Sequence, residues 1–531
     1  MWVKWPARDQ DTDAHRHEQQ QGERDADKES PHGGIITAPA AQQVPDTLAI
    51  ALLASEVAPL SKTGGLADVV AALGKVLHAD GHDVRLFTPL YASIDAEALG
   101  AVPVAGLGSL PLRIGSLVYV ISVLRAQLPG SGAPLFLIDC PALYARPSIY
   151  TADPDEHVRF IAFTRAAFAA CQGLGWAPQV LHCHDWHAGF APLFLRSSYG
   201  KEALFAATRT LLTIHNIGYQ GIFSAADVAD LNLGDAVGLL HPGDLKAGRI
   251  SALRQGILYA DAISTVSPTH AREICTDEYG MGMQDSLRER AAVLTGILNG
   301  VDYDVWDPRH DRYLPQHFDP QHLEVKAALK RIFVRHLGLD VDPGVPLAGI
   351  VSRLAPQKGI ELMYAALPRV LAARPLAFVA LGSGEPQYEA FFTRLAAEFA
   401  GRVVFRRGYD EELAHWIEAA CDLFLMPSRY EPCGLNQMYS LRYGTVPVVR
   451  RTGGLADSVQ HYDAASGTGT GVVFNDFDPP ALEWALNTAL DLYAQPAVWA
   501  RLRANGMRQD FSWQHQAAQY VALYRKLTAS V

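Results

Sequence analysis

The sequence predicts an α/β protein with two doubly wound, parallel-sheet domains that face each other across a cleft. After Pro45, short apolar runs alternate with longer amphipathic stretches, which is typical of βαβ units. The same alternation begins again at about Pro346. The stretch NGVDYDVWDPRHDRYLPQHFDP between the two series is rich in Asp, Pro and Tyr without a sustained period, so we expect the connection between the domains to lie there, within 301–345.

The first series has the order strand, helix, strand. The pattern predicts a strand within 47–57, a helix over 66–81 and a second strand over 83–91. Further strands are expected at QVLHCHD, TLLTIHN and AISTVS, and each of these apolar runs ends in polar residues. Ligands of open α/β sheets bind beyond the carboxyl ends of the strands, so these polar residues should meet in one crevice.

The second series predicts a second parallel sheet, with strands at LAGIVSRL, LAFVALGSG, VVFRRG, LFLMPS and VPVVRR. A final helical pattern, DFSWQHQAAQYVALYRKL, is expected to pack across the interface. The domain prediction is therefore a disordered polar tail over 1–45, a first domain over 46–300, the connection over 301–345, a second domain over 346–505 and a C-terminal helix over 506–531.

Composition excludes several classes of protein. Lys and Arg number 45 against 56 Asp and Glu, a net charge of −11, which disfavours a nucleic-acid or anionic-membrane binder. No apolar run approaches the ~20 residues of a membrane-spanning helix. Six cysteines lie without C-x-x-C spacing, which argues against a disulfide scaffold or a zinc ribbon and favours a reducing cytoplasm. Whether the chain forms a homo-oligomer is left open.

One segment occurs twice, as KTGGLAD over 62–68 and RTGGLAD over 451–457. Each has a cation, a Thr and a Gly pair just before a helix. Glycines let backbone N–H groups approach a ligand, and a helix N-terminus carries partial positive charge, so each is a candidate anion seat. The alternative is that each Gly pair only makes a tight turn.

Two cations, Arg353 and Lys358, follow the predicted strand LAGIVS within a Pro-containing turn. They could converge on a diphosphate, and Lys62 would add a third cation at a strand end of the other domain. The alternative is a solvated loop with two ordinary surface charges.

A third candidate is SRYEPCGLNQMYSLRYG, where Glu431 precedes the helix that begins after Gly434 and Leu435. A carboxylate there could bind sugar hydroxyls, and the following backbone donors could bind oxygens of a ligand. The alternative is a helix cap. Cys433 has no companion His or Asn pattern, so it is interpreted as a packed or pocket-lining thiol rather than a nucleophile.

The run HCHDWH, residues 182–187, could suggest a metal, but H-x-H-x-x-H at a strand end has no fixed ligand geometry. We interpret Asp185, His215 and Asn216 as strand-end groups that face the crevice, and we expect no metal and no other cofactor. The lone Gly382-Ser383-Gly384 is an incomplete dinucleotide fingerprint.

These motifs together resemble a known family. KTGGLADV, HCHDWHAG, HNIGYQG, STVSPTHAREI, GILNGVD, SRLAPQKG, YEPCGLNQMYSLRYG and RTGGLADSV occur in the order seen in bacterial glycogen synthases and plant starch synthases, retaining glycosyltransferases of family five. The resemblance runs from about residue 47 to the C-terminus. It implies the GT-B fold and transfer of glucose from ADP-glucose to the non-reducing end of an α-1,4-glucan such as glycogen, with release of ADP.

The resemblance also implies roles for the residues in these motifs. Arg353 and Lys358 would neutralise the diphosphate, Glu431 would hold the donor glucose, and Asp185 and His215 would act beside it. The expected donor-binding residues are Lys62, Gly64, Gly65, Tyr144, Asn216, Asn299, Cys433, Gly434, Leu435, Thr452 and Gly453. Tyr144 resembles a tyrosine placed near the adenine.

Retention without an evident carboxylate nucleophile implies attack on the face from which ADP departs, with the diphosphate helping to deprotonate the acceptor. The sequence departs from the wider pattern at Tyr439, where other retaining transferases have a second Glu, and at Arg254, where many relatives have Lys. Three alternatives remain: UDP-glucose as the donor, a catalytically silent glucan-binding relative, and an α-glucan phosphorylase, for which no pyridoxal phosphate lysine motif is found.

Overall fold

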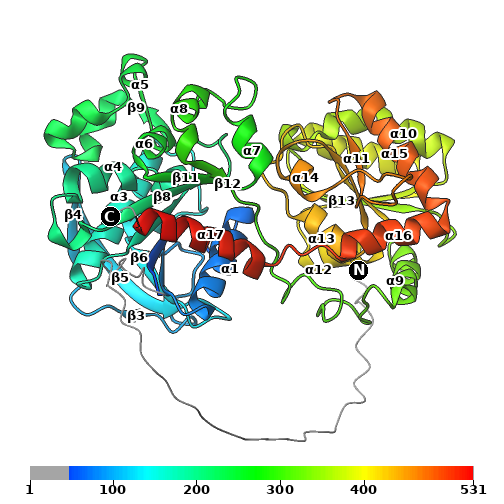
Figure 1. The fold of residues 1–531 in the computed structure, drawn as a ribbon, viewed down its shortest axis with the longest axis horizontal. Helices are drawn as coiled ribbons and strands as arrows, with labels where there is room; N and C mark the ends of the chain where they lie inside the picture. Colours follow the sequence, from blue (N-terminus) through cyan, green and yellow to red (C-terminus); the bar gives the residue numbers. More distant parts are fainter. Residues whose placement is uncertain (1–46, 530–531) are drawn as a thin grey trace, which may run out of the picture. The chain divides into compact units, whose positions relative to one another are not determined.

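The computed structural model describes residues 47–529, and the predicted tail over 1–45 lies outside them. Two large sheets organise the described chain (Figure 1). We call the part built on the 10-stranded sheet the first lobe and the part built on the six-stranded sheet the second lobe. No helix of residues 47–529 is long and apolar enough to cross a membrane.

The first sheet has the strand order β12-β11-β8-β7-β1-β2-β6-β5-β3, with β4 paired to β5. Strands from β12 to β6 run parallel, whereas β5 is antiparallel to β6, β3 and β4. The strands are β1 Ala49–Leu53, β2 Asp83–Pro89, β3 Val102–Pro103, β4 Leu110–Ile114, β5 Leu117–Gln127, β6 Pro134–Asp139, β7 Val180–His184, β8 Arg209–Ile214, β11 Ala262–Thr265 and β12 Leu294–Gly296, and a separate pair is formed by β9 Ile222–Ser224 and β10 Arg249–Ser251.

The second sheet is parallel throughout, in the order β15-β14-β13-β16-β17-β18. Its strands are β13 Leu347–Val351, β14 Ala377–Gly382, β15 Val403–Arg407, β16 Leu423–Met426, β17 Val446–Arg450 and β18 Val472–Phe474. All five strands predicted for the second series are present. The antiparallel edge of the first sheet was not predicted, because β2 to β6 follow one another without an intervening helix, so this stretch lacks the strand–helix alternation on which the prediction rested.

Helices flank the strands of both sheets. The α-helices are α1 Gly65–Ala79, α2 Pro141–Tyr144, α3 Glu156–Gly173, α4 Ala191–Phe194, α5 Pro242–Lys246, α6 Ala252–Tyr259, α7 Pro268–Glu273, α8 Gln284–Glu289, α9 Leu323–His336, α10 Ile360–Ala373, α11 Pro386–Glu398, α12 Glu411–Ala420, α13 Asn436–Arg442, α14 Gly453–Ser458, α15 Pro479–Tyr493, α16 Pro496–Met507 and α17 Trp513–Thr528. In α1, Leu66, Val69, Val70, Leu73 and Leu77 form one buried stripe at helical spacing.

The last two helices belong to different lobes. The helix α16 contacts α13 and β17, whereas α17 contacts α1 and β7 and lies along the first lobe in Figure 1. Trp513, Tyr520 and Tyr524 of α17 are buried in the core of the first lobe. The final helix therefore begins at Trp513, later than predicted, and packs on the first sheet, while residues 508–512 make the crossing.

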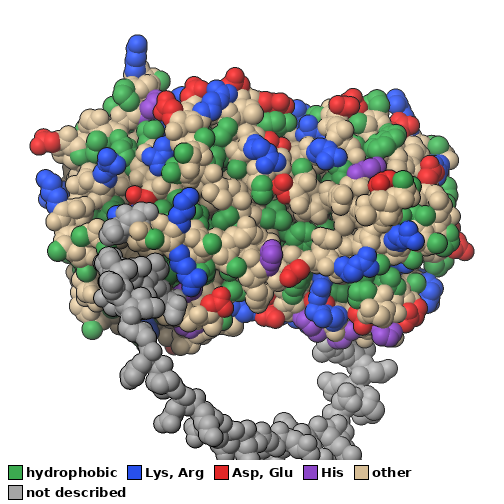
Figure 2. Space-filling view, in the orientation of Figure 1, with side chains coloured by type: hydrophobic (Ala, Val, Ile, Leu, Met, Phe, Trp, Pro, Cys, Tyr) green, Lys and Arg blue, Asp and Glu red, His purple; other side chains and the backbone are tan. Residues whose placement is uncertain are grey.

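The surface mixes charges of both signs. On the face drawn in Figure 2, acidic and basic side chains are interspersed with apolar and neutral ones.

Candidate active site

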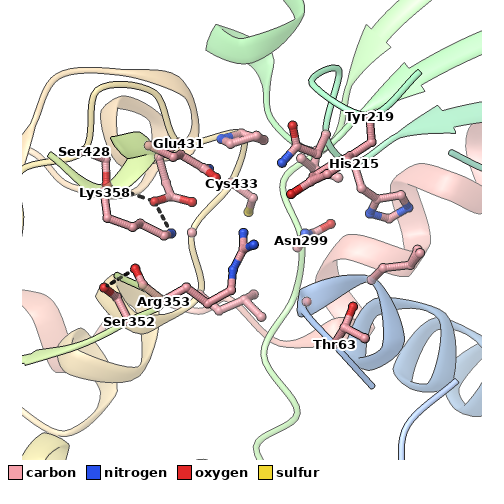
Figure 3. Close-up of a pocket in the computed structure, with 18 of the residues that line it drawn as sticks. Thr63, His215, Tyr219, Asn299, Ser352, Arg353, Lys358, Ser428, Glu431 and Cys433 are labelled. Atoms are coloured by element: carbon pink, nitrogen blue, oxygen red, sulfur yellow. Dashed lines mark hydrogen bonds and ion pairs between the residues drawn. The ribbon is translucent and has the colours of Figure 1, made fainter. Parts of the chain in front are cut away.

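The strand ends of both sheets meet at one cavity of about 760 Å³. Of the sixteen predicted site residues, eleven line it: Gly65, Asp185, His215, Asn216, Asn299, Arg353, Lys358, Glu431, Cys433, Gly434 and Leu435. Figure 3 shows Thr63, His215 and Asn299 on one side, and Lys358, Glu431 and Ser428 on the other. The sequence motifs of the two series therefore converge on one place.

Lys358 and Glu431 form an ion pair on the second-lobe side of the cavity. The Lys358 Nζ lies 2.6 Å from a Glu431 carboxylate oxygen, which also accepts a hydrogen bond from Ser428 at 3.0 Å. Glu431 is 5% exposed. Lys358 is brought there by a tight turn, in which Gly359 has a φ of +66° and an added Cβ would meet the Pro427 carbonyl oxygen at 2.0 Å.

Arg353 is the second cation of the cavity. Its side chain extends toward the space between Lys358 and Asn299 (Figure 3). Among the described residues, no hydrogen bond or ion pair engages its guanidinium group. Its donors therefore remain available to a ligand, unlike those of Lys358.

Asp185 ties two strand ends of the first sheet together. It follows β7 with a φ of +54°, a strained conformation for a residue other than glycine. Its carboxylate accepts hydrogen bonds from the backbone N–H of His215, at 2.7 Å, and of Asn216, at 3.3 Å. Burial raises the pKa of Asp185 to about 7, against the lowering effect of these two donors.

His215 is a neutral imidazole at the cavity wall, because burial lowers its pKa to about 3. Its Nε2 lies 2.9 Å from the Nδ1 of His184. His182 is bonded to Tyr524 and Thr213, so His182 and His184, two of the three histidines of HCHDWH, are engaged with protein groups. Within residues 47–529, no group of three or more His, Cys, Asp or Glu side chains is placed to hold a metal ion.

The loop that contains the first Gly pair donates hydrogen bonds to the carboxylate of Glu56, a residue that the sequence analysis did not identify. Glu56 accepts hydrogen bonds from the backbone and side chain of Thr63, at 2.5 and 2.8 Å, from the Gly64 N–H at 3.3 Å and from the Tyr150 hydroxyl at 2.5 Å. Glu56 is 2% exposed, and it lines the cavity together with Thr63 and Tyr150. Lys62 and Gly64 do not line the cavity, and Lys62 pairs with Asp68 at 2.9 Å.

The second Gly pair does not face the cavity, contrary to the prediction for Thr452 and Gly453. The Thr452 hydroxyl and the Gly453 N–H donate to Glu273 of the first lobe, at 2.9 and 3.0 Å. A Cβ on Gly453 would lie 1.9 Å from the Glu431 carbonyl oxygen. Because Gly453 has no side chain, its backbone can pack closely against the Glu431 backbone. It contacts the site from outside the cavity.

Tyr144 was predicted to bind the donor, but it does not line the cavity. Its ring is fully buried in the first-lobe core, and its hydroxyl donates to the Arg159 carbonyl oxygen at 2.9 Å. Tyr150, six residues later, is the tyrosine that lines the cavity. The two share the motif LYARPSIY, and the sequence holds no signal that separates a core tyrosine from an exposed one.

Cys433 lines the cavity but is a poor nucleophile, because burial raises its thiol pKa to about 12. The two departures from the wider family pattern have structural explanations. Tyr439 stacks on Trp306 with ring centroids 4.1 Å apart, and Arg254 forms a buried ion pair with Asp244 at 2.8 Å.

The cavity can therefore bind an anion beside Arg353 and Lys358 and a polyhydroxylated group among Glu431, Asp185, His215 and Asn299. Three further lining residues that sequence reasoning missed, Tyr150, Thr151 and Glu156, come from the loop around Tyr150 and the start of α3. These residues do not follow a predicted strand, so the expectation that ligands bind beyond the carboxyl ends of strands could not identify them.

Comparison with known proteins identifies the family of this chain. The family model of the starch synthase catalytic domain matches residues 49–289, and that of glycosyl transferases group 1 matches 339–505. Glycogen synthase of Anaeromyxobacter dehalogenans (strain 2CP-C) is 46% identical, covering 90% of this chain and 99% of the relative. Glycogen synthase of Thioalkalivibrio sulfidiphilus is 44% identical, covering 90% and 100%.

A solved structure is similar as well. The catalytic domain of starch synthase IV from Arabidopsis thaliana, bound to ADP and acarbose, is 34% identical with a TM-score of 0.84, covering 91% of this chain and all of that one. The chain therefore belongs to the glycogen and starch synthases, retaining glycosyltransferases with the GT-B fold.

Proposed function

We propose that this protein transfers glucose from ADP-glucose to the non-reducing end of an α-1,4-glucan such as glycogen, with retention of configuration and release of ADP. One observation carries the proposal. Arg353 and Lys358 reach the same cavity as Glu431 and the strand-end groups Asp185 and His215, so a diphosphate and a sugar can be held side by side.

The leaving group is stabilised by fixed positive charge. As the bond between glucose C1 and the diphosphate oxygen breaks, negative charge grows on ADP, and Arg353 and Lys358 lie where they can neutralise it. Lys358 is bonded to Glu431 in the described structure. Binding of the donor would give Lys358 a second anionic partner and leave Glu431 free to accept from glucose hydroxyls.

The family retains the configuration of glucose, and the engagement of the cavity's carboxylates disfavours a covalent intermediate on one of them. Glu56 accepts from Thr63 and Tyr150, Glu156 pairs with Arg159 at 2.7 Å, and Asp185 holds two backbone N–H groups. Glu431 accepts from Lys358 and Ser428, and in this scheme it accepts from glucose hydroxyls once the donor is bound. We therefore infer attack from the face that ADP leaves: the acceptor oxygen bonds to C1, and its proton passes to a phosphate oxygen of ADP.

The choice of ADP-glucose rests on the family and on the ADP bound in the starch synthase IV structure. UDP-glucose is the competing donor. A catalytically silent glucan-binding protein is disfavoured, since it would have no use for two cations converging beside Glu431. All six cysteines lie among the described residues without a disulfide, which supports our inference of action in a reducing cytoplasm. No metal is required in this scheme.

The test is product analysis. The protein is incubated with ADP-glucose carrying labelled glucose and with glycogen, and the elongated glucan is digested by an exo-acting enzyme specific for α-1,4 linkages. We expect complete release of the label, since retention makes an α linkage at the non-reducing end. Label that resists this digestion, or release of free glucose without elongation, would contradict the proposal.

A further inference from the structure

A hydrogen bond between two histidines lies directly behind the cavity. His184, the last residue of β7, is fully buried, and its Nδ1 lies 2.9 Å from the Nε2 of His215. His215 lines the cavity, whereas His184 does not. One of these two nitrogens must carry a proton and the other must accept it.

Burial lowers the pKa of both imidazoles far enough that both are neutral at pH 7. A neutral imidazole carries one proton, so the direction of this hydrogen bond fixes both rings. If His184 donates through Nδ1, His215 must carry its own proton on Nδ1. If His215 donates through Nε2, His184 must carry its proton on Nε2.

The surroundings of His184 distinguish these cases. Its Nε2 is buried and has no hydrogen-bond partner among the described residues. A proton on that atom would be a buried N–H without an acceptor, and such orphaned donors are rarer in proteins than unfilled acceptors. Donation from His184 Nδ1 to His215 Nε2 avoids this orphaned N–H.

The His184 ring is held in place from the side of the C-terminal helix. His182 lies against it, with ring centroids 4.0 Å apart. Both nitrogens of His182 are engaged, Nδ1 with the Tyr524 hydroxyl of α17 at 2.8 Å and Nε2 with the Thr213 hydroxyl at 2.5 Å. The His182 ring therefore cannot turn without breaking two hydrogen bonds, and it limits the rotation of His184.

We propose that His184 is a positioning residue that fixes the proton of His215 on Nδ1, so that His215 presents an N–H donor to the sugar bound in the cavity. A neutral N–H donor there matches a sugar hydroxyl or ring oxygen, and it does not add a positive charge beside the glucosyl group as positive charge develops on it. The effect on catalysis rests on the proposed glucosyl transfer, but the position of the proton does not.

The proton is located by NMR on the full-length protein carrying ¹⁵N-labelled histidine. Two-bond nitrogen–proton correlations distinguish the Nδ1–H from the Nε2–H form of a neutral imidazole, and the His215→Asn variant assigns the signals. We expect the Nδ1–H form in the unmodified protein. Finding the Nε2–H form of His215 would overturn the proposal, whether or not the His184 variants fold.

Variants connect the proton to activity. His184→Leu removes the donor, so we expect the Nε2–H form of His215 to appear and kcat to fall by about tenfold or more. His184→Asn places an amide N–H close to the former Nδ1, and it should restore the Nδ1–H form and most of the lost kcat. Cys183→Ala is the matched control, because neighbouring side chains of a strand point to opposite faces, and it should leave the His215 proton in place.

The outcomes separate the two proposals. A changed proton position in His184→Leu with unchanged kcat would refute the role of His184 in catalysis. Loss of kcat with the Nδ1–H form retained would show that His184 acts only through packing, which also refutes it. If neither sugar nucleotide supports transfer by the unmodified protein, the proposed function fails, while the NMR result still decides the proton position.

Discussion

At the scale of single residues, the ion pair between Lys358 and Glu431 is the most informative contact of the cavity. Both side chains are mostly buried, at 18% and 6% exposure, and they hold each other 2.6 Å apart. If Lys358 had a purely structural role, Glu431 would neutralise its charge and no further cation would be needed beside this pair. Here Arg353 stands nearby without such a partner among the described residues, so the positive charge of this corner exceeds what Glu431 neutralises.

Replacing Lys358 with Ala tests whether this charge acts on the leaving group. We expect kcat to fall by ~10²-fold or more while the Kd for ADP rises far less, as when a preorganised charge-stabilising group is removed. Steady-state kinetics and calorimetric titration with ADP provide the two numbers. Arg369→Ala, which removes an exposed cation of α10 paired with Glu483, is the control. A raised KM with normal kcat would make Lys358 a simple binding contact.

Asp185 predicts a pH-dependent stability difference. Its pKa is about 7 in the folded protein against an ordinary 3.8, so the unfolded chain loses this proton first as the pH rises. The stability that the group contributes is present below about pH 4 and is lost as the pH approaches 7. Asp185→Asn cannot titrate. Its free energy of unfolding, relative to the unmodified protein, should therefore increase by a few kcal/mol from pH 4 to pH 7.5 at ~1.4 kcal/mol per unit of pKa.

Urea denaturation of both proteins across this range checks the sign. A difference that stays constant or falls with rising pH would mean that the two backbone N–H groups keep Asp185 ionised in the folded protein. In that case its carboxylate would already be charged when the donor binds.

Tyr144 and Tyr150 show how far the sequence predicts the position of a single residue. The motif LYARPSIY directs attention to Tyr144, but Tyr150 reaches the cavity, because the short helix α2 turns Tyr144 into the core. Arg353, Lys358, Asp185 and Glu431 line the cavity as predicted, since topology brings strand ends together, whereas the predicted cation Lys62 does not. An aromatic ring fits a core and a binding site equally well, so the sequence pattern does not show whether a given tyrosine lies in the core or lines the cavity.

At the scale of elements, the two TGG segments have the same sequence but different partners. The first segment donates hydrogen bonds to Glu56 of its own lobe. The second, at the start of α14, donates hydrogen bonds to Glu273. The contact is reciprocal, because Asp457 of α14 accepts from the backbone and hydroxyl of Thr269 in α7, both at 2.7 Å. Each short helix thus has a carboxylate from the other near its first turn, which satisfies free backbone donors.

Thr452→Val distinguishes this structural role from the predicted donor seat. Removing the hydroxyl deletes one hydrogen bond to Glu273, so we expect a loss of about 1 kcal/mol in unfolding free energy and a KM for ADP-glucose within twofold of the unmodified value. Thermal unfolding and initial rates measure the two quantities. A KM raised tenfold with unchanged stability would return Thr452 to the donor site.

The elements that the sequence did not predict share a physical reason. The strands β3, β4 and β5 lie at an edge of the first sheet, where Val118 and Val120 are more than half exposed. Although β5 is rich in apolar residues, β3, β4 and β5 follow one another without a helix between them, so they do not repeat the strand–helix alternation of a parallel sheet. The parallel strands β1, β13 and β14 are each followed by a helix, and their patterns were clear.

At the scale of the whole molecule, the proposed binding of the leaving group by Arg353 and Lys358 predicts glucosyl transfer without a metal. We therefore expect full activity after treatment with EDTA and removal of the chelated metal. Initial rates before and after treatment measure this. Loss of activity, with recovery on adding one particular divalent ion, would mean that the histidines of HCHDWH exchange their present partners for a metal.

We propose that the two lobes together form one site for a nucleotide diphosphate sugar, with ADP as the leaving group. Nucleotide release from ADP-glucose and from UDP-glucose, each with and without glycogen and over a range of donor concentrations, tests this directly. We expect glycogen-dependent release of ADP and a higher kcat/KM for ADP-glucose. A higher kcat/KM for UDP-glucose, or no glycogen-dependent release from either donor, would contradict it.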